Sequence, residues 1–299
     1  MKVLELFSGT RSIGEAFEKR GHEVFSVEWD ESLPADLHAD IEFLKAPDVL
    51  RAFGRPDVVW ASPDCATFSM AGISRHRRKN ANTGNLDPVS DYALKCDRVD
   101  LAMLRLIRDL RPALYFIENP RAGLRKQDMM AVIPRHTVTY CQYGARAMKP
   151  TDIFTNASDP RFRPPCRNGA PCHESAPRGS KSGTQGLANA RERGRIPERL
   201  CLHIVDVCER EVPIRKAAGL CRGKARQERR QAASPAPAGR PSRRRAATGR
   251  PPRGCSWRSI PGSTSPSTRR ARTPTPNAKG TSPNETTGSR PTGAARECG

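Results

Sequence analysis

The chain has 299 residues, with 52 Lys+Arg against 31 Asp+Glu, which gives a formal net charge of +21. This length allows one large domain or two small ones, and a mean hydropathy of -0.66 with only 5% aromatic residues argues against one core that takes in every residue. The absence of a long apolar run excludes a transmembrane helix and makes a secretory signal unexpected. The ten cysteines have no framework spacing, so we expect reduced thiols in a cytoplasmic protein. The excess positive charge indicates an acidic partner, with nucleic acid the first candidate.

Most of that excess charge lies in the C-terminal part of the sequence. Residues 211–299 hold 20 Lys+Arg and 4 Asp+Glu, a net charge of +16, which leaves +5 for residues 1–210. The same part holds 12 of the 27 prolines and a single aromatic residue, Trp257. Such a composition buries too little apolar surface to offset the entropy of ordering, so we expect a disordered, basic, Pro/Arg-rich tail. Three interpretations of the tail stay open: a nucleic-acid-binding arm, a solvated tail without function, and an out-of-frame translation of GC-rich DNA.

Residues 1–210 alternate between strand and helix patterns. Ser12 and Glu15 fit a capping box that begins a helix, and apolar residues at helical spacing predict a longer helix over 98–110. Short apolar runs predict strands at Val3–Phe7, Val24–Glu28, Asp57–Ala61, Leu114–Ile117, Thr137–Tyr140 and Asp152–Thr155. This alternation predicts an α/β fold with a doubly wound, mostly parallel sheet, in which ligands bind at the carboxyl ends of the strands.

The turn after the first strand and the end of the second form a candidate nucleoside site. The small residues of 7–14 let a ligand approach the backbone at a helix N-terminus. Glu28 follows Gly9 by 19 residues and is placed to accept hydrogen bonds from ribose hydroxyls, and Trp29 offers a flat face for adenine. The spacing Gly-x-Gly-x-x-Gly of dinucleotide sites is absent, and a plain tight turn is the alternative. Asp40 is expected to close the site, although it also fits a loop cap. The residues assigned to the cofactor are Phe7, Ser8, Gly9, Thr10, Glu28, Trp29, Asp40, Ile41 and Pro63.

Two reactive groups follow the next strands. Cys65 comes directly after the third strand, where a thiolate would be placed for nucleophilic attack; an inert buried cysteine is the alternative. Glu118 ends a later strand and opens into Asn119-Pro120, which would hold the carboxylate rigidly; an ordinary surface glutamate is the alternative. The segment 70–91 after Cys65 carries four cations suited to phosphates, although it also fits a solvated loop.

Five motifs in chain order resemble those of the cytosine-C5 DNA methyltransferases, of the compact kind common on phage and prophage. They are Phe7-Ser-Gly9, Glu28-Trp29, Ser62-Pro-Asp-Cys65, Glu118-Asn-Pro120 and Gln142-Tyr-Gly144. The resemblance covers about residues 1–205. It implies the Rossmann-like fold of S-adenosylmethionine-dependent methyltransferases, S-adenosyl-L-methionine as cofactor, and a cytosine-containing DNA duplex as partner. It also implies a bacterial or phage-encoded protein, for which restriction–modification, phage protection and an orphan role stay open. We expect a monomer that does not bind membranes.

The resemblance assigns roles to the reactive residues. Cys65 would add to C6 of a cytosine that has left the base stack, and Glu118 would hold its N3 and amino edge. The segment 70–91 resembles the family's mobile catalytic loop. The residues assigned to nucleic acid are Ser69, Arg75, Arg77, Arg78, Lys79, Asn119, Lys149 and Thr151.

The chain departs from the family pattern at several places. Asp64 stands where the family usually has a second proline, and a carboxylate there would disfavour the thiolate. Lys149 and Thr151 fall on two arginine positions of a later motif. The target-recognition region is reduced to about 157–190, and the Gly-Asn-x-Val element that completes the family's cofactor pocket is missing.

Cys166, Cys172 and His173 are the remaining cluster with metal-ligand chemistry. They supply three ligands at most, so a zinc ion would need Cys141 or Cys201 to join, and we assign no metal from the sequence. The predicted function is DNA (cytosine-5-)-methylation through a Cys65 adduct. The alternatives are a nucleic-acid-binding relic that has lost turnover and an RNA cytosine methyltransferase. A nicotinamide oxidoreductase would leave Cys65 and Glu118 unexplained.

Overall fold

The computed structural model describes residues 1–175 and 190–232, with the side chains of 190–191 and 220–232 left out. Contacts divide the chain into Met1–Ala238 and Gly239–Gly299, and the second unit lies outside the described residues. The elements of the first unit are β1 (Lys2–Leu6), α1 (Ser12–Lys19), β2 (Glu23–Glu28), β3 (Leu37–His38), α2 (Ala46–Ala52), β4 (Val58–Ala61), α3 (Ile73–His76), β5 (Arg77–Lys79), β6 (Leu86–Pro88), α4 (Asp91–Leu110), β7 (Leu114–Pro120), η1 (Leu124–Lys126), α5 (Asp128–Ala131), β8 (Arg135–Thr139), η2 (Tyr140–Tyr143), β9 (Pro150–Thr155), α6 (Ala190–Gly194) and α7 (Glu198–Ala232).

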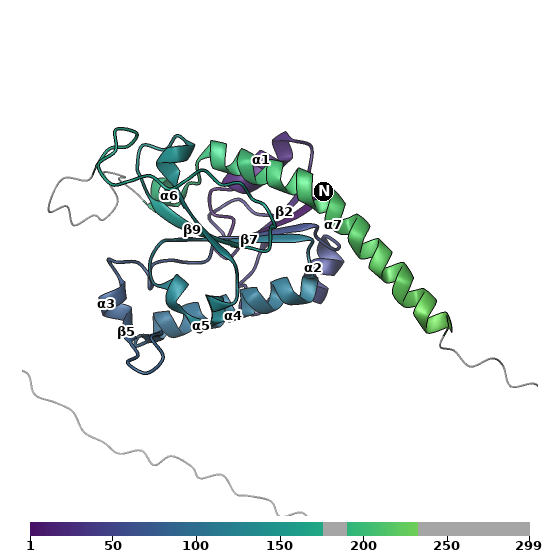
Figure 1. Ribbon diagram of the computed structural model, residues 1–299. Helices are drawn as coiled ribbons and strands as arrows, with labels where there is room; N and C mark the ends of the chain where they lie inside the picture. The colour runs from purple at the N-terminus through teal and green to yellow at the C-terminus, as the bar shows by residue number, and fades with distance from the viewer. Residues whose placement is uncertain (176–189, 233–299) are drawn as a thin grey trace, which may run out of the picture. The chain divides into compact units, whose positions relative to one another are not determined.

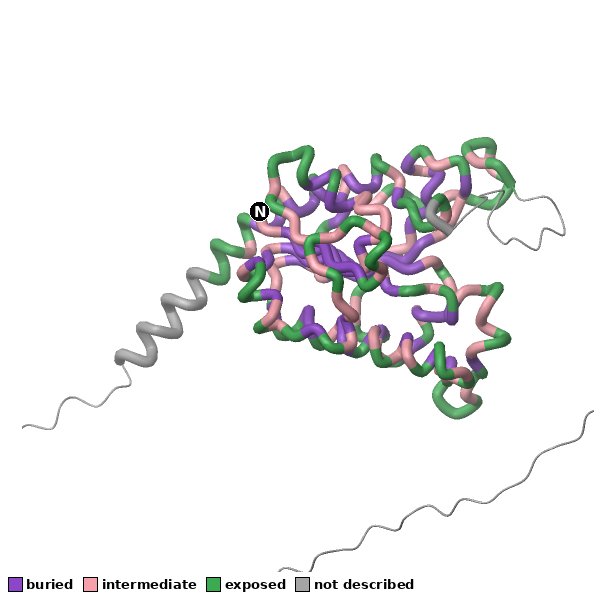
Figure 2. Tube along the Cα trace, turned by 180° about the vertical axis from the view of Figure 1, so that it is seen from behind, coloured by how far each residue is buried: buried purple, intermediate pink, exposed green. Residues whose placement is uncertain are grey.

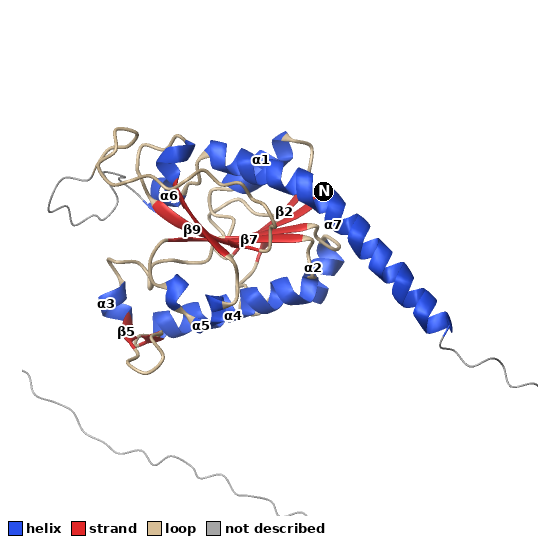
Figure 3. Cartoon of the chain, in the orientation of Figure 1, coloured by secondary structure: helices blue, strands red, loops and turns tan. Residues whose placement is uncertain are grey.

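A seven-stranded sheet forms the centre of this unit, in the order β3-β2-β1-β4-β7-β9-β8. The pairs from β3 through β7 are parallel, and β9 runs antiparallel to both β7 and β8. Helices cover both faces, with α1 and α7 on one side and α2, α4 and α5 on the other (Figures 1 and 3). The prediction of a doubly wound, mostly parallel Rossmann-like sheet is confirmed.

Each face of the sheet has its own hydrophobic core. Val3 and Trp60 point toward α1 and α7 and pack with Phe17, Leu200 and Ile204. The alternate strand residues, among them Leu4 and Val59, pack on the opposite face against Met103, Leu106 and Leu110 of α4. Strands buried on both faces read as continuous apolar runs, which is why the sequence located them well. Figure 2 shows the buried residues concentrated along the strands.

The starts of the two predicted helices shift. Ser12 is the first residue of α1 rather than its cap, because Arg11 before it adopts a left-handed conformation with φ 52° and caps no backbone group. The helix predicted over 98–110 begins earlier, at Asp91, where Ser90 Oγ accepts a hydrogen bond from the Ala93 N–H. The capping hydroxyl thus lies eight positions upstream of the predicted start.

The predicted start of the tail at residue 211 falls inside α7, which continues to Ala232. Glu211 is buried and accepts hydrogen bonds from the Ser158 N–H at 2.9 Å and the Asp159 N–H at 3.1 Å. Val212 is buried, and Lys216 forms an ion pair with Asp57 at 2.6 Å. Residues just past 210 therefore belong to the folded unit, while the interpretations of 233–299 concern residues outside the described part.

Among the described residues, none of the helices combines the length and apolar character that crossing a bilayer requires.

Candidate active site at the carboxyl ends of the strands

The carboxyl ends of β2, β1, β4 and β7 lie side by side at one edge of the sheet. Leu6 pairs with Val27 on one side and with Ala61 on the other, and Ala61 pairs with Ile117. The residues directly after these positions are the ones the sequence singled out. The parallel register therefore brings together the turn 7–11, Glu28, the turn 62–65 and Glu118.

Glu28 organises the nucleoside corner. Its carboxylate is buried; Oε2 accepts a hydrogen bond from the Gly9 N–H at 2.9 Å, and Oε1 accepts one from the Trp29 N–H at 2.9 Å. These bonds tie the end of β2 to the turn after β1. Trp29 itself is 72% exposed, so its indole face is open to a ligand.

The turn after β1 has the backbone that a close ligand approach requires. Phe7 and Gly9 have φ values of 57° and 49°, in the left-handed region that favours glycine. The Ser8 hydroxyl is buried and has no hydrogen-bond partner within the described residues, whereas Thr10 Oγ1 bonds to Ser12 Oγ at 2.7 Å. An orphaned hydroxyl beside a buried carboxylate and an open indole fits the expected adenosyl group.

Asp40 has a structural role in this conformation. Its Oδ1 accepts a hydrogen bond from the Glu42 N–H at 2.9 Å, and its Oδ2 binds Lys95 Nζ at 2.5 Å. Both oxygens of the Asp40 carboxylate therefore have partners in the protein, as the loop-cap alternative predicts. Ile41 is buried in the core on the α4 face.

Cys65 lies on the turn after β4. Its carbonyl accepts hydrogen bonds from the N–H groups of Phe68 at 3.1 Å and Ser69 at 2.8 Å, which fix the turn. Burial raises the pKa of the Cys65 thiol to about 11, and the negative charges of Glu118 and Asp64 add to the rise while Lys149 opposes it. The groups expected to act on one substrate therefore already interact electrostatically.

Asp64 points away from the core and is held by local bonds. Its Oδ1 accepts a hydrogen bond from the Ala66 N–H at 2.7 Å, and the Tyr92 hydroxyl donates to its Oδ2. The carboxylate that replaces the family's proline is thus exposed and paired with α4. Tyr92 gave no signal in the sequence, because it reads as an ordinary residue of a helix surface.

Glu118 is buried and oriented by a residue that the sequence did not reveal. The Tyr140 hydroxyl donates to Glu118 Oε1 at 2.8 Å, and Oε2 accepts no hydrogen bond within the described residues. Asn119 Nδ2 donates to the Pro63 carbonyl at 3.1 Å, which ties the Cys65 turn to the end of β7. The sequence signal that could have identified Tyr140 is its position directly after a strand, since strand ends are where the site forms.

Lys149 and Thr151 take different positions near the site. Lys149 Nζ lies 4.5 Å from the centre of the Tyr140 ring and donates to the Arg193 carbonyl at 2.7 Å. Thr151 is fully buried, and its hydroxyl donates to the Lys149 carbonyl at 3.2 Å. A base contact through Lys149 fits its place, whereas a base contact through Thr151 is contradicted by its burial in this conformation.

The segment after Cys65 folds into α3 and the β5–β6 hairpin, and one of its predicted phosphate ligands is wrong. The Arg77 guanidinium is buried, donates to Thr67 Oγ1 at 2.9 Å, forms an ion pair with Asp97 at 2.7 Å and stacks on Phe68. It holds the loop on α4 and is not available to DNA. Arg75, Arg78 and Lys79 are exposed, and Ser69 Oγ donates to the Ala66 carbonyl at 2.9 Å.

A cavity of about 520 Å³ lies beside this edge, between α1, the loop after η2 and the link from α6 to α7. Tyr140 and Lys149 line it, so it shares two residues with the site, although neither Cys65 nor Glu118 lines it. We place the chemistry at the strand ends, where the buried carboxylates and the thiol converge.

The chain is similar in sequence to a viral protein and, over part of its length, to methyltransferases of known structure. No family model matches the chain. A protein of Frog virus 3 (isolate Goorha) named "Probable DNA (cytosine-5)-methyltransferase" is 29% identical over 229 residues, which cover 70% of this chain and 100% of the relative. A candidate DNA modification methyltransferase of an E. coli prophage covers 52% of this chain and 46% of its own, at 18% identity and a TM-score of 0.38.

The S. pombe Dnmt2 methyltransferase covers 52% of this chain and 48% of its own length, at 14% identity and a TM-score of 0.37. The chain thus spans about half the length of these two solved structures. The match, which spans the whole length of the viral relative, confirms the resemblance predicted from the five ordered motifs: the chain is similar to a protein named as a probable DNA (cytosine-5)-methyltransferase.

Proposed function

We propose that this protein transfers a methyl group from S-adenosyl-L-methionine to C5 of cytosine in DNA, with Cys65 as the nucleophile. The observation that carries the proposal is that Cys65 and Glu118 lie at the carboxyl ends of two neighbouring strands, β4 and β7. Besides burial, the charge of Glu118 is the largest cause that raises the pKa of the Cys65 thiol. Ala61 pairs with Ile117, and Asn119 Nδ2 donates to the Pro63 carbonyl at 3.1 Å, so the two groups follow adjacent strand ends that are bonded to each other. A base held by one group and attacked by the other requires such neighbours.

The cofactor is held at the adjacent corner in this proposal. Glu28 would bind the ribose hydroxyls, the Ser8 hydroxyl would find its missing partner, and Trp29 would stack on the adenine. When bound there, S-adenosyl-L-methionine supplies the electrophilic methyl group. The backbone N–H groups that already bind Glu28 keep its carboxylate in place before the ligand arrives.

The residues of this chain act on the base as follows. The cytosine leaves the stack, at a cost of roughly a few kcal/mol. The Cys65 thiolate forms a bond to C6, and the electron pair of the C5–C6 double bond moves to C5, which then takes the methyl group. The C5 proton leaves to a base, the C6–S bond breaks, and the thiolate returns as the double bond reforms.

Glu118 would hold N3 and the amino group of the base. The Tyr140 hydroxyl fixes Oε1 of this carboxylate and leaves Oε2 for the base. Lys149 opposes the rise of the Cys65 pKa, so it favours the thiolate that attacks. Arg75 on α3 and Arg78 and Lys79 on β5 would contact phosphates.

The covalent step is tested by trapping. Wild-type protein, S-adenosyl-L-methionine and DNA that contains 5-fluorocytosine should give a shifted band on a denaturing gel, because fluorine blocks the loss from C5. Cys65→Ala should give none, and Cys96→Ala, which removes a buried thiol of α4, should behave as the wild type. No band with wild type, or an equal band with Cys65→Ala, contradicts the adduct.

The cofactor corner is tested separately. Calorimetric titration with S-adenosylhomocysteine should show binding that weakens at least tenfold in Glu28→Ala, since two hydrogen bonds to a charged group are lost. Unchanged affinity would remove Glu28 from the ribose. Methyl transfer assayed on DNA and on RNA, followed by base-resolution sequencing of the product, identifies the polymer and the target sequence.

One observation favours a second candidate, a nucleic-acid-binding relic of the fold. A thiol with a pKa of about 11 is almost wholly protonated at neutral pH, and Asp64 contributes to that state. A relic would bind S-adenosylhomocysteine and DNA but form no adduct, whereas an enzyme forms it.

A further inference from the structure

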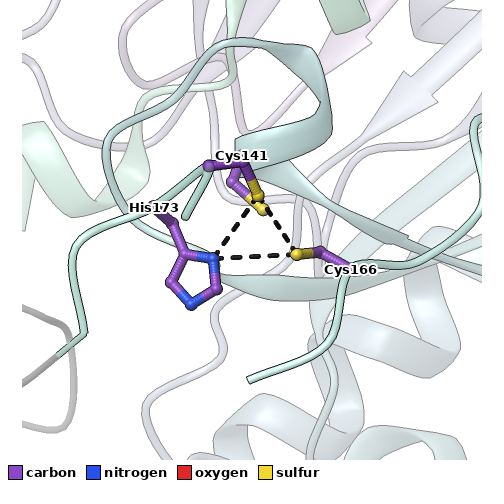
Figure 4. A group of neighbouring side chains, drawn as sticks. Cys141, Cys166 and His173 are labelled. Carbon is purple, nitrogen blue, oxygen red and sulfur yellow. Dashed lines mark hydrogen bonds between the residues drawn. The ribbon is translucent and has the colours of Figure 1, made fainter. Parts of the chain in front are cut away.

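Cys141, Cys166, Cys172 and His173 form a cluster that methyl transfer does not use. Three Sγ atoms and His173 Nδ1 all lie within 4.8 Å of one another. Cys141 belongs to η2, and the other three lie in the irregular segment after β9. The side chains of Cys141, Cys166 and His173 point toward a common centre (Figure 4). We infer that the cluster is a binding site for a structural Zn²⁺ ion.

The distances from His173 Nδ1 to the two thiols suit zinc. Zn–S bonds of about 2.3 Å and Zn–N bonds of about 2.0–2.1 Å, in a tetrahedron, place sulfur and nitrogen about 3.6 Å apart. His173 Nδ1 lies 3.7 Å from Cys166 Sγ and 3.6 Å from Cys172 Sγ. The His173 Nε2 atom is buried without a hydrogen-bond partner among the described residues, whereas Nδ1 faces the thiols, so Nδ1 would be the ligand.

A disulfide does not account for the cluster. Cys166 Sγ and Cys172 Sγ are 3.2 Å apart, whereas a disulfide bond is about 2.05 Å long. A disulfide between these two residues would also leave Cys141 and His173 without a reason to converge on them. Four convergent ligands of the soft sulfur and imidazole types are what zinc prefers.

The structure also decides between the two cysteines that were open as a fourth ligand. Cys201 is buried in the core between α1 and α7, where its thiol faces the Ile196 carbonyl at 3.8 Å. Cys141 is adjacent to the three other ligands instead. The assignment of no metal from the sequence is therefore revised, since the missing ligand comes from 25 residues upstream of Cys166.

The four protein ligands leave no open coordination position, which is the mark of a structural rather than a catalytic zinc site. No residue of 161–175 is buried, so this segment has no apolar core of its own. It is held by single contacts, such as the Cys166 N–H donating to Thr139 Oγ1 at 2.9 Å and the Glu174 N–H donating to the Arg146 carbonyl at 3.0 Å. A zinc ion would fasten the segment to η2 and so to the end of β8, in place of hydrophobic burial.

The proposal is tested by metal analysis of the full-length protein, purified with a reducing agent and without chelator. Inductively coupled plasma mass spectrometry should find close to one zinc ion per chain. Cys166→Ser and His173→Ala should lose the zinc, whereas Cys96→Ser, a cysteine in α4 outside the cluster, should retain it. If the zinc site is structural, these variants can also misfold. A second measurement is therefore made on the wild-type protein.

That measurement replaces the metal by Co²⁺. The cobalt protein should show the intense visible bands of tetrahedral coordination together with a thiolate-to-metal charge-transfer band, and a mercurial that blocks thiols should release the ion. The proposal is overturned if the reduced wild type takes up no stoichiometric zinc, if Co²⁺ binds with octahedral spectra only, or if Cys166→Ser retains zinc as the wild type does. A Cys166–Cys172 disulfide in the freshly purified protein would overturn it as well.

Discussion

The charges around Cys65 make a graded prediction about the reactivity of its thiol. Burial, then Glu118, then Asp64 raise its pKa to about 11, so only about one thiol in a thousand is a thiolate at pH 8. Glu118→Gln and Asp64→Asn each remove one negative charge with little change in shape. Both should make Cys65 more reactive toward iodoacetamide, and Glu118→Gln should have the larger effect.

The burial of the two carboxylates sets the magnitudes. Unit charges about 6 Å apart interact by about 3 kcal/mol at an effective dielectric constant of 20 and by about 0.7 kcal/mol in water. Glu118 is 6% exposed and lies near the first limit, whereas Asp64 is exposed and lies near the second. At about 1.4 kcal/mol per unit, the pKa of Cys65 falls by one to two units in Glu118→Gln and by about half a unit in Asp64→Asn.

Thiolate nucleophilicity falls with the pKa at a Brønsted slope of about 0.4–0.5, which halves the logarithm of each gain. The alkylation rate at about pH 8 should therefore rise roughly three- to tenfold in Glu118→Gln and about twofold in Asp64→Asn. The rate is followed by mass spectrometry of the Cys65 peptide, because the chain has ten cysteines. Asp109→Asn, which changes an exposed carboxylate at the end of α4, is the matched control.

Ionic strength separates the two variants further. The effect of Asp64→Asn should shrink in high salt, because exposed charges are screened, while that of Glu118→Gln should persist. The electrostatic account is refuted if neither variant changes the rate, if Asp64→Asn has the larger effect, or if the control accelerates as much as either.

Three further predictions concern stability and positioning. Burial raises the pKa of Glu5 to about 7 from about 4.5, so the folded state binds the extra proton between these values and the free energy of unfolding falls by about 3 kcal/mol as pH rises through this range. Denaturant unfolding should show a steeper fall with pH in the wild type than in Glu5→Gln, where buried Asp100, whose pKa is also raised, still contributes; equal slopes would contradict the prediction. A chain ending at 210 should unfold at a lower denaturant concentration than one ending at 232, because it lacks the contacts of Glu211 with residues 158–159 and of Lys216 with Asp57. Equal unfolding midpoints would place the end of the folded unit back at residue 210. Tyr140→Phe should lower the methyl-transfer rate about tenfold with S-adenosylhomocysteine affinity unchanged, since it frees Glu118 Oε1 but touches no cofactor residue; a parallel loss of affinity would mean general unfolding.

The central strands could be predicted because a strand that is buried on both faces appears in the sequence as a continuous apolar run. The strands β3, β5 and β6 were not predicted, because each has only two or three residues, which is too short to show an apolar pattern. Polar residues at strand ends were found because a parallel sheet fixes where those ends meet, whatever the loops do. Glu28, Cys65 and Glu118 needed only that rule.

Residues whose role depends on a distant partner were beyond the sequence. Arg77 stands in a run of cations that reads as a solvated phosphate-binding face, and only the fold places Thr67 and Asp97 around its guanidinium. Tyr140 has no motif, because its meaning comes from the pairing that sets it beside Glu118. Charge and periodicity describe a residue's own surroundings along the chain and carry no information on contacts of this kind.

The zinc proposal bears on how so compact a chain could present a recognition surface. About 34 residues separate Asn156 from Arg191, which is too few for an independent hydrophobic core. Exposed Arg163 and Arg167 flank Cys166 in this stretch, and an arginine can select among DNA sequences only if its backbone is fixed relative to the target base. A four-ligand metal site anchored on η2, which begins with the Tyr140 that orients Glu118, would supply that fixed relation at the smallest cost in chain length. Loss of zinc should then weaken DNA binding while leaving S-adenosylhomocysteine binding at the Glu28 corner unchanged, because no residue of that corner belongs to the cluster.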